Sequence, residues 1–145
     1  MTAEELWKQS GLNGDYDAWQ FGEAPDELAA QVLSGIKTAT CSAYDLYEAE
    51  GEKFPEEGQY SIVLDSKDEA VCIIKTARVY VTAFDQVTAE HAYKEGEGDR
   101  SLKYWRDVHE RFLKKELASI SQTFDGSTKV VCEEFVLVYP VGNNK

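Results

Sequence analysis

Apolar and polar residues follow two different periods along this chain, and the changes between them mark the expected elements. Helical patterns cover residues 3–9, 25–34, 43–50, 88–96 and 101–118. Strand-like patterns, rich in β-branched residues, cover 38–43, 59–65, 70–84 and 129–139. The order lacks the regular strand-helix-strand alternation of a parallel sheet, so the pattern predicts an α+β fold.

The pattern within two of these segments predicts which residues are buried. Ser101 is placed to cap the last helix, and Trp105 and Phe112 lie on its apolar stripe. We therefore expect both aromatic residues to be buried, with Lys103 and Arg106 at least partly exposed. The strand at 129–139 has apolar residues on both faces, which predicts an interior strand.

The aromatic segment at 11–21 has no clear period. Tyr16, Trp19 and Phe21 either fill the core or form the floor of a base-binding pocket. The core is the expected location, because aromatic residues bury large apolar areas. Trp19 is retained as a candidate stacking residue for a substrate.

Size and composition predict one domain spanning residues 1–145. No apolar run reaches the roughly 20 residues of a membrane span, and the first residues are acidic where a signal peptide is basic. We therefore expect a cytoplasmic protein without membrane contact. The three cysteines, Cys41, Cys72 and Cys132, are too widely spaced to suggest a disulfide framework or a zinc site, and small buried hydrophobes are expected.

A formal net charge of −12 narrows the choice of ligand. Long duplex nucleic acid is disfavoured, because surplus acidic groups repel the phosphate backbone. A nucleoside or a short single strand is compatible with a local basic rim and aromatic stacking. The candidates for that rim are Lys37, Arg100, Lys103 and Arg106, although these charges also suit simple pairing with neighbouring acids on helix faces.

The segment that follows the second helix carries the first candidate for chemistry. Lys37 precedes Thr38, Thr40 and Ser42, whose hydroxyls share one face of the predicted strand. The small neighbours of Lys37 leave room for a substrate. The alternative is a solvated lysine that the dipole of the preceding helix favours.

A second candidate is the acidic run Glu95, Glu97 and Asp99. It resembles a calcium loop only in its spacing, because an EF-hand beginning at Glu95 would have Arg100 and Arg106 where it needs glycine and glutamate. A hard cation such as Mg²⁺ or Mn²⁺ on one or two of these carboxylates remains an open alternative, and no cofactor is assigned. His109, on the apolar side of the last helix, is expected to be a packed histidine.

Three motifs together resemble the ASCH domain family, in its bacterial single-domain branch. They are Asp-Ala-Trp-Gln-Phe-Gly at 17–22, Gly-x-Lys-Thr-x-Thr at 35–40, and the run from His91 to His109 that contains Glu-Gly-Glu-Gly-Asp and Tyr-Trp-Arg. The resemblance spans Trp19 to Tyr139. It implies a PUA-like closed or partly open β-barrel with flanking helices, and substrates that are RNA or modified nucleosides.

The resemblance also implies a site. A related amidohydrolase of acetylated cytidine uses a Lys-x-x-Thr motif and a Glu in a His-Ala-x-x-Glu pattern, which match Lys37, Thr40 and Glu95 here, and another member resembles a metal-dependent ribonuclease. If the three residues meet, Lys37 can accept a proton from the Thr40 hydroxyl while Glu95 shuttles protons in amide hydrolysis. On RNA, Lys37 can stabilise the phosphorus centre while Glu95 deprotonates a 2′-hydroxyl. A non-catalytic RNA-binding module is the second hypothesis. The oligomeric state stays open.

Overall fold

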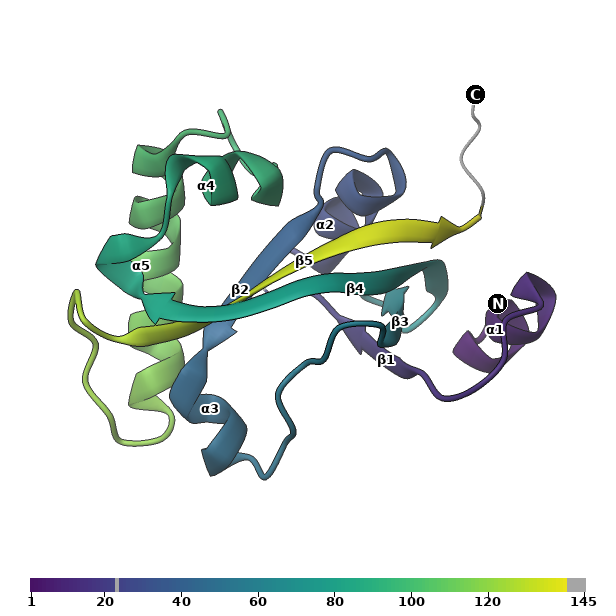
Figure 1. The fold of residues 1–145 in the computed structure, drawn as a ribbon, viewed down its shortest axis with the longest axis horizontal. Helices are drawn as coiled ribbons and strands as arrows, with labels where there is room; N and C mark the ends of the chain where they lie inside the picture. The colour runs from purple at the N-terminus through teal and green to yellow at the C-terminus, as the bar shows by residue number, and fades with distance from the viewer. Residues whose placement is uncertain (23, 141–145) are drawn as a thin grey trace.

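A five-stranded, strongly curled sheet forms the centre of the molecule (Figure 1). The structure is a computed structural model, and it describes residues 1–22 and 24–140. The strand order is β1-β3-β4-β5-β2, in which only β1 and β3 pair in parallel. The strands are β1 (Asp17–Gln20), β2 (Ala39–Ala43), β3 (Tyr60–Leu64), β4 (Ala70–Ala83) and β5 (Lys129–Tyr139). The edge strands β1 and β2 do not pair with each other, so the curled sheet stays open as a half-barrel. This is the partly open form of the barrel that the resemblance implies.

Helices flank the two ends of this half-barrel. Figure 1 shows α4 and α5 at one end of the sheet and α1 at the other. The helical elements are α1 (Ala3–Ser10), α2 (Pro25–Leu33), α3 (Tyr44–Ala49), the 3-10 turn η1 (Phe84–Gln86), α4 (Ala89–Glu95) and α5 (Leu102–Ala118). The α+β class is confirmed. No helix of the described chain is long and apolar enough to cross a membrane.

Local hydrogen bonds define the ends of the helices next to the site. The Thr88 hydroxyl accepts a bond from His91 N, and Ser101 caps α5 in the same way through Tyr104 N. Gly96 ends α4 with a φ of 77°, a left-handed conformation that glycine adopts without strain. The caps fix where α4 stops, and therefore where Glu95 and the following loop lie.

The apolar stripe of α5 packs on the sheet as expected. Trp105, Leu113 and Leu117 are buried against residues of β2 and β5, while Lys103 and Arg106 are exposed. Phe112 is only half-buried, which corrects the expectation that it lies in the core. Its ring passes over Gly22, where the missing side chain leaves space, and it borders an open cleft.

The sheet itself differs from expectation at one edge. Residues 17–20 of the aromatic segment form β1, which pairs with β3. The strand at 129–139 is interior, as predicted, because β5 lies between β4 and β2. Cys72 and Cys132 are buried as expected, whereas Cys41 is half-buried, and all three are free thiols.

Candidate functional site

Lys37 lies beneath the end of α4, not in solvent. After Gly35 ends α2 with a φ of 86°, Thr38 N donates to Lys94 O at 2.7 Å and draws the chain against α4. The Lys37 side chain is 1% exposed. Its Nζ lies 3.2 Å from the carbonyl oxygen of Glu95 and 3.1 Å from Glu97 Oε2. The interpretation of Lys37 as a solvated surface lysine is therefore wrong.

Glu95 is the centre of a buried polar cluster. Its Oε2 accepts hydrogen bonds from Trp105 Nε1 at 2.7 Å and pairs with His91 Nε2 at 2.6 Å. Its Oε1 lies 3.3 Å from His109 Nε2 and 3.5 Å from Lys37 Nζ. Both oxygens thus have two partners each, although Glu95 is only 1% exposed. We call Lys37, His91, Glu95, Trp105 and His109 the polar cluster.

These partners determine the charge state of Glu95. Burial alone would raise the pKa of its carboxyl, but the Lys37 charge and the hydrogen bonds of His109 and His91 outweigh burial and hold that pKa well below its usual value. Burial lowers the pKa of His109, yet the hydrogen bond and charge of Glu95 dominate and raise it. Glu95 is therefore a carboxylate at neutral pH.

A large cleft opens beside the polar cluster, with a volume of about 950 Å³. Thr40, Ser42 and Trp19 line it, together with Phe21 and Cys41. Neither Lys37 nor Glu95 is part of its lining. They lie one layer behind it, because Lys37 Nζ is 5.3 Å from the centre of the Phe21 ring and Cys41 Sγ is within 4.8 Å of a Glu95 oxygen.

The three predicted site residues with hydroxyl side chains have different surroundings. Ser42 Oγ is 2.6 Å from the hydroxyl of Tyr47, at the wall of the cleft. Thr38 Oγ1 donates to Lys94 O at 3.3 Å, so Thr38 ties the chain to α4 and does not line the cleft. Within the described residues, the Thr40 hydroxyl makes no hydrogen bond to Lys37 or Glu95. The structure therefore brings Lys37 and Glu95 together, whereas Thr40 lies on β2 at the wall of the cleft.

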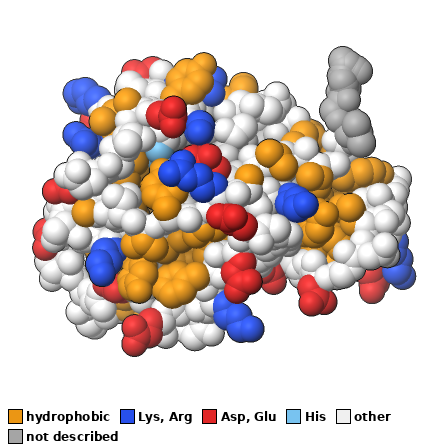
Figure 2. Space-filling model, viewed as in Figure 1, with side chains coloured by type: hydrophobic (Ala, Val, Ile, Leu, Met, Phe, Trp, Pro, Cys, Tyr) orange, Lys and Arg blue, Asp and Glu red, His pale blue; other side chains and the backbone are white. Residues whose placement is uncertain are grey.

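The predicted basic rim is not assembled around the cleft. Arg100 lies with its guanidinium 3.7 Å from the centre of the Tyr93 ring, Lys103 pairs with Asp107, and Arg106 donates to the Asp85 carbonyl. These three cations do not line the cleft, because they lie in the α4–α5 loop and on the solvent side of α5. On the face shown in Figure 2, positive and negative side chains intermingle.

The three carboxylates proposed for a hard cation do not share a site for one, because two of them converge on a lysine. Glu95 and Glu97 both contact Lys37, and Asp99 accepts a hydrogen bond from Ser101 N. A different set, Cys41, Glu95 and His109, places its donor atoms within 4.8 Å of one another. A thiol is a poor ligand for Mg²⁺ or Mn²⁺, and the Lys37 ammonium 3.5 Å from Glu95 repels a cation. The residues present do not fit either ion.

The sequence interpretation missed several members of this region. His91 entered only as a marker for Glu95 and His109 only as a packing residue, yet both bind the Glu95 carboxylate. Glu133 was also missed. It lines the cleft, is 8% exposed, and pairs with Thr40 across β2 and β5. Two consecutive glutamates inside an otherwise apolar strand were the available signal, because the side chain of one of them must turn inward.

The comparisons with known proteins agree with this architecture. The family model of the ASCH domain matches residues 17–139. The structure resembles the ASCH domain from Lactobacillus crispatus JV V101 with a TM-score of 0.88 and 27% identity, covering 94% of this chain and 93% of that one. A protein from Enterococcus faecalis V583 is similar with a TM-score of 0.81 and 31% identity, covering 98% and 94%. No curated protein matches the chain significantly. ASCH domains have a PUA-like fold and generally bind RNA. This chain belongs to the ASCH domain family.

Proposed function

We propose that this protein binds a nucleoside, or a short single-stranded RNA, in the 950 Å³ cleft and hydrolyses an acyl amide on the base. Thr40, on the cleft wall, is the proposed catalytic residue, and Lys37 and Glu95, one layer behind it, act through their charges. The observation that supports this most is a buried lysine–glutamate pair, 3.5 Å apart, directly behind the wall that carries Thr40. Burying such charges costs several kcal/mol each, and strongly perturbed groups beside a cleft are typical of functional sites.

The cleft matches a base better than a phosphate. Trp19, Tyr47, Phe54 and Phe112 supply aromatic surface for stacking. Among the described residues that line it, the charged ones are seven acids and Lys53, so a ligand with few or no phosphates is favoured. The acids are Asp15, Asp17, Glu50, Glu52, Glu56, Glu116 and Glu133. Amide hydrolysis is therefore favoured over phosphodiester cleavage.

The proposed reaction assigns Thr40 the step that faces the ligand. Its hydroxyl attacks the acyl carbonyl or orients the water that does so, the carbon–nitrogen bond breaks, and the proton released by the attacking hydroxyl or water passes to the leaving base amine. On the first route water then hydrolyses the threonyl ester, so that both routes release the free base and a carboxylic acid. Because the Glu95 carboxylate and the Glu97 carboxylate both contact Lys37 Nζ, Lys37 serves as a fixed positive charge near the developing oxyanion. This replaces the neutral-amine version of its role.

A non-catalytic binding module is the alternative that one observation favours. Lys37 and Glu95 are each 1% exposed, and their polar atoms are already satisfied internally. In that case the polar cluster only supports the cleft wall, and the cleft binds a base without reacting with it.

A hydrolysis screen with a matched pair of variants tests the proposal. The parent protein is incubated with N4-acylated cytidines and short single-stranded RNAs, with and without Mn²⁺, and products are separated by chromatography. We expect cytidine release without added metal, a loss of at least about a hundredfold in Thr40→Val, and no change in Thr123→Val on an exposed loop. Absence of turnover in the parent, or full activity in Thr40→Val, would contradict the proposed chemistry.

A further inference from the structure

Glu133 is an acidic side chain buried at the wall of the cleft. It is 8% exposed, and within the described residues it forms no ion pair. Its neighbour Glu134, by contrast, lies 3.3 Å from Arg78 and 3.4 Å from Lys94. A buried carboxylate without such a partner is costly, so the position calls for another source of hydrogen-bond donors.

Among the residues that the structure describes, only one of the two Glu133 oxygens has a hydrogen-bond donor. Glu133 Oε2 accepts a bond of 2.6 Å from the Thr76 hydroxyl. No hydrogen bond within the described chain reaches Oε1, and this oxygen is not among the fully buried unsatisfied atoms, so it is open to the cleft that Glu133 lines. Burial raises the pKa of Glu133, with the Thr76 bond acting in the opposite direction. The cleft therefore contains a free acceptor on an otherwise enclosed carboxyl group.

The register of the sheet places this acceptor beside Thr40. Thr40 and Glu133 are directly opposite in the antiparallel pairing of β2 and β5. Opposed residues in such a pair point to the same face with their Cβ atoms about 4.5–5.5 Å apart. A planar ligand in the cleft can thus meet the hydroxyl and the carboxylate together, with Trp19 available on β1 for stacking.

We propose that Glu133 recognises the exocyclic N–H edge of a nucleobase in this cleft and selects ligands that carry no phosphate there. This inference rests on the proposed use of the cleft for a nucleoside. A carboxylate accepts from an exocyclic amino group such as that of cytosine, and a buried acceptor discriminates strongly against a ligand that lacks the donor. In the proposed hydrolysis, the same oxygen holds the N–H of the scissile amide while Thr40 faces its carbonyl.

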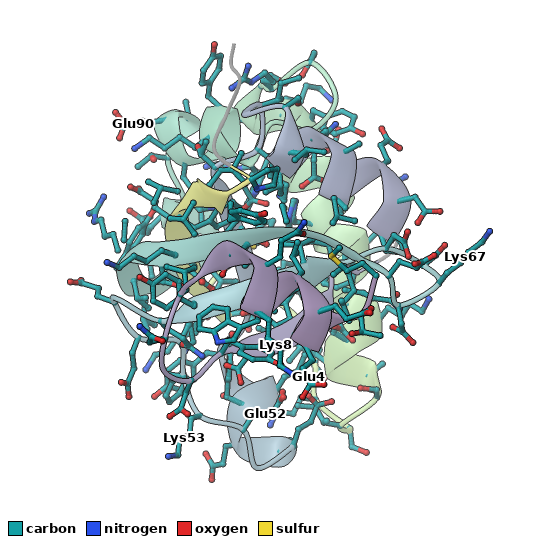
Figure 3. The ribbon with its side chains drawn as sticks, turned by 90° about the vertical axis from the view of Figure 1, so that its right-hand side faces the viewer. Glu4, Lys8, Glu52, Lys53, Lys67 and Glu90 are labelled. Carbon is teal, nitrogen blue, oxygen red and sulfur yellow. The ribbon has the colours of Figure 1, made fainter. Side chains whose placement is uncertain are left out.

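The acidic mouth of the cleft supports the second part of the inference. Glu52 and Lys53 follow α3 and lie at its edge of the molecule, where Figure 3 shows both side chains. Lys53 is the one cation among the described lining residues, against seven acids. A phosphate attached to the ligand would meet a net negative surface, whereas an uncharged sugar would not.

A binding cycle between a variant and a ligand analogue tests the inference. The two ligands are cytidine and N4,N4-dimethylcytidine, which lacks the exocyclic N–H. Calorimetry gives their affinities for the parent, Glu133→Gln and Glu134→Gln. Glu134→Gln is the matched control, because it also removes one negative charge from β5. We expect the parent and Glu134→Gln to prefer cytidine by at least about tenfold, the loss expected for one bond to a charged acceptor. Glu133→Gln should bind both ligands with similar affinity.

The outcome is independent of turnover. An unchanged preference for cytidine in Glu133→Gln, or tighter binding of cytidine 5′-monophosphate than of cytidine by the parent, would overturn the inference. If the parent hydrolyses acylated cytidine but Glu133→Gln keeps the preference for cytidine, the proposed function stands and Glu133 does not recognise the base. If Glu133→Gln loses the preference for cytidine but the parent hydrolyses no acylated cytidine, base recognition by Glu133 is supported and the proposed catalysis is contradicted. A matching melting temperature of the variants shows that Glu133→Gln is folded.

Discussion

At the scale of single residues, Glu95 determines the character of the site. Its two oxygens have four partners from three different elements: Lys37 after α2, His91 on α4, and Trp105 and His109 on α5. The carboxylate therefore links three segments of the chain. Because these donors all point at Glu95, they lose their common acceptor if the charge is removed.

We expect Glu95→Gln to lower the free energy of unfolding by about 3–5 kcal/mol, the cost of leaving buried charged partners unpaired. Chemical denaturation at neutral pH measures this change. Glu90→Gln is the matched control, because Glu90 is an exposed residue of α4 whose oxygen is 3.8 Å from Lys94. An equal effect in the two variants would mean that the polar cluster contributes no special stability.

The pH dependence of this difference identifies the charges responsible. The pKa of Glu95 is lowered in the folded state, so its contribution is present above pH 4.5 and is lost as the pH falls through the folded value. The pKa of His109 is raised, so its contribution is present below pH 6.5 and is lost as the pH rises through the folded value. The stability gap between the parent and Glu95→Gln should be largest between those two pH values, and a flat profile would contradict the assigned charges.

At the scale of elements, hydrophobic period and capping residues predicted nearly every helix and strand. Strand β1 was missed because its four residues, Asp17–Gln20, are mostly exposed and lie at a sheet edge, where neither face requires a regular apolar pattern. The pairing of Lys37 with Glu95 came from the motif match to the family, since 58 positions separate the two residues. The role of Glu133 depended on strand register, which periodicity alone does not supply.

The loop after α4 holds the site together through a close approach of two backbones. A Cβ on Gly96 would lie 2.7 Å from the carbonyl oxygen of Ile36, which directly precedes Lys37. Gly35 also has a positive φ, but a Cβ there meets nothing within 4 Å. Alanine variants of the two glycines therefore distinguish two costs. Gly35→Ala introduces backbone strain alone, whereas Gly96→Ala adds a steric clash with Ile36.

We expect Gly35→Ala to cost about 1–2 kcal/mol of stability, from left-handed strain alone. Gly96→Ala should cost a further ~1–3 kcal/mol, because α4 must move away from Ile36. Thermal unfolding of both variants provides the comparison. Equal losses would show that the approach of α4 to Lys37 is looser than the structure indicates.

At the scale of the whole molecule, charge restricts the ligand more than the fold does. The chain carries a formal net charge of −12, and the lining of the large cleft is acidic as well. The four cations predicted to form a basic rim, Lys37, Arg100, Lys103 and Arg106, lie outside that cleft. ASCH domains generally bind RNA, but the acidic cleft of this member favours a small ligand of low charge.

We expect cytidine to bind with almost no salt dependence, because it releases no counterions. A single strand should add a slope of roughly −0.7 per phosphate neutralised to the plot of log affinity against log salt concentration. Long duplex RNA should bind weakly at physiological salt. Titration of all three across a salt series tests this, and tight duplex binding with a steep slope would show that a concentrated basic surface outweighs the net charge.

The measurement that tests the central proposal most directly separates binding from turnover in Lys37→Met. Calorimetry gives the affinity for cytidine, and chromatography gives the rate of deacylation of an N4-acylated cytidine. We predict that affinity stays within about twofold of the parent, because Lys37 is not part of the cleft lining, while turnover falls by at least about a hundredfold through loss of the fixed charge. Full turnover in a folded Lys37→Met protein would contradict the catalytic account.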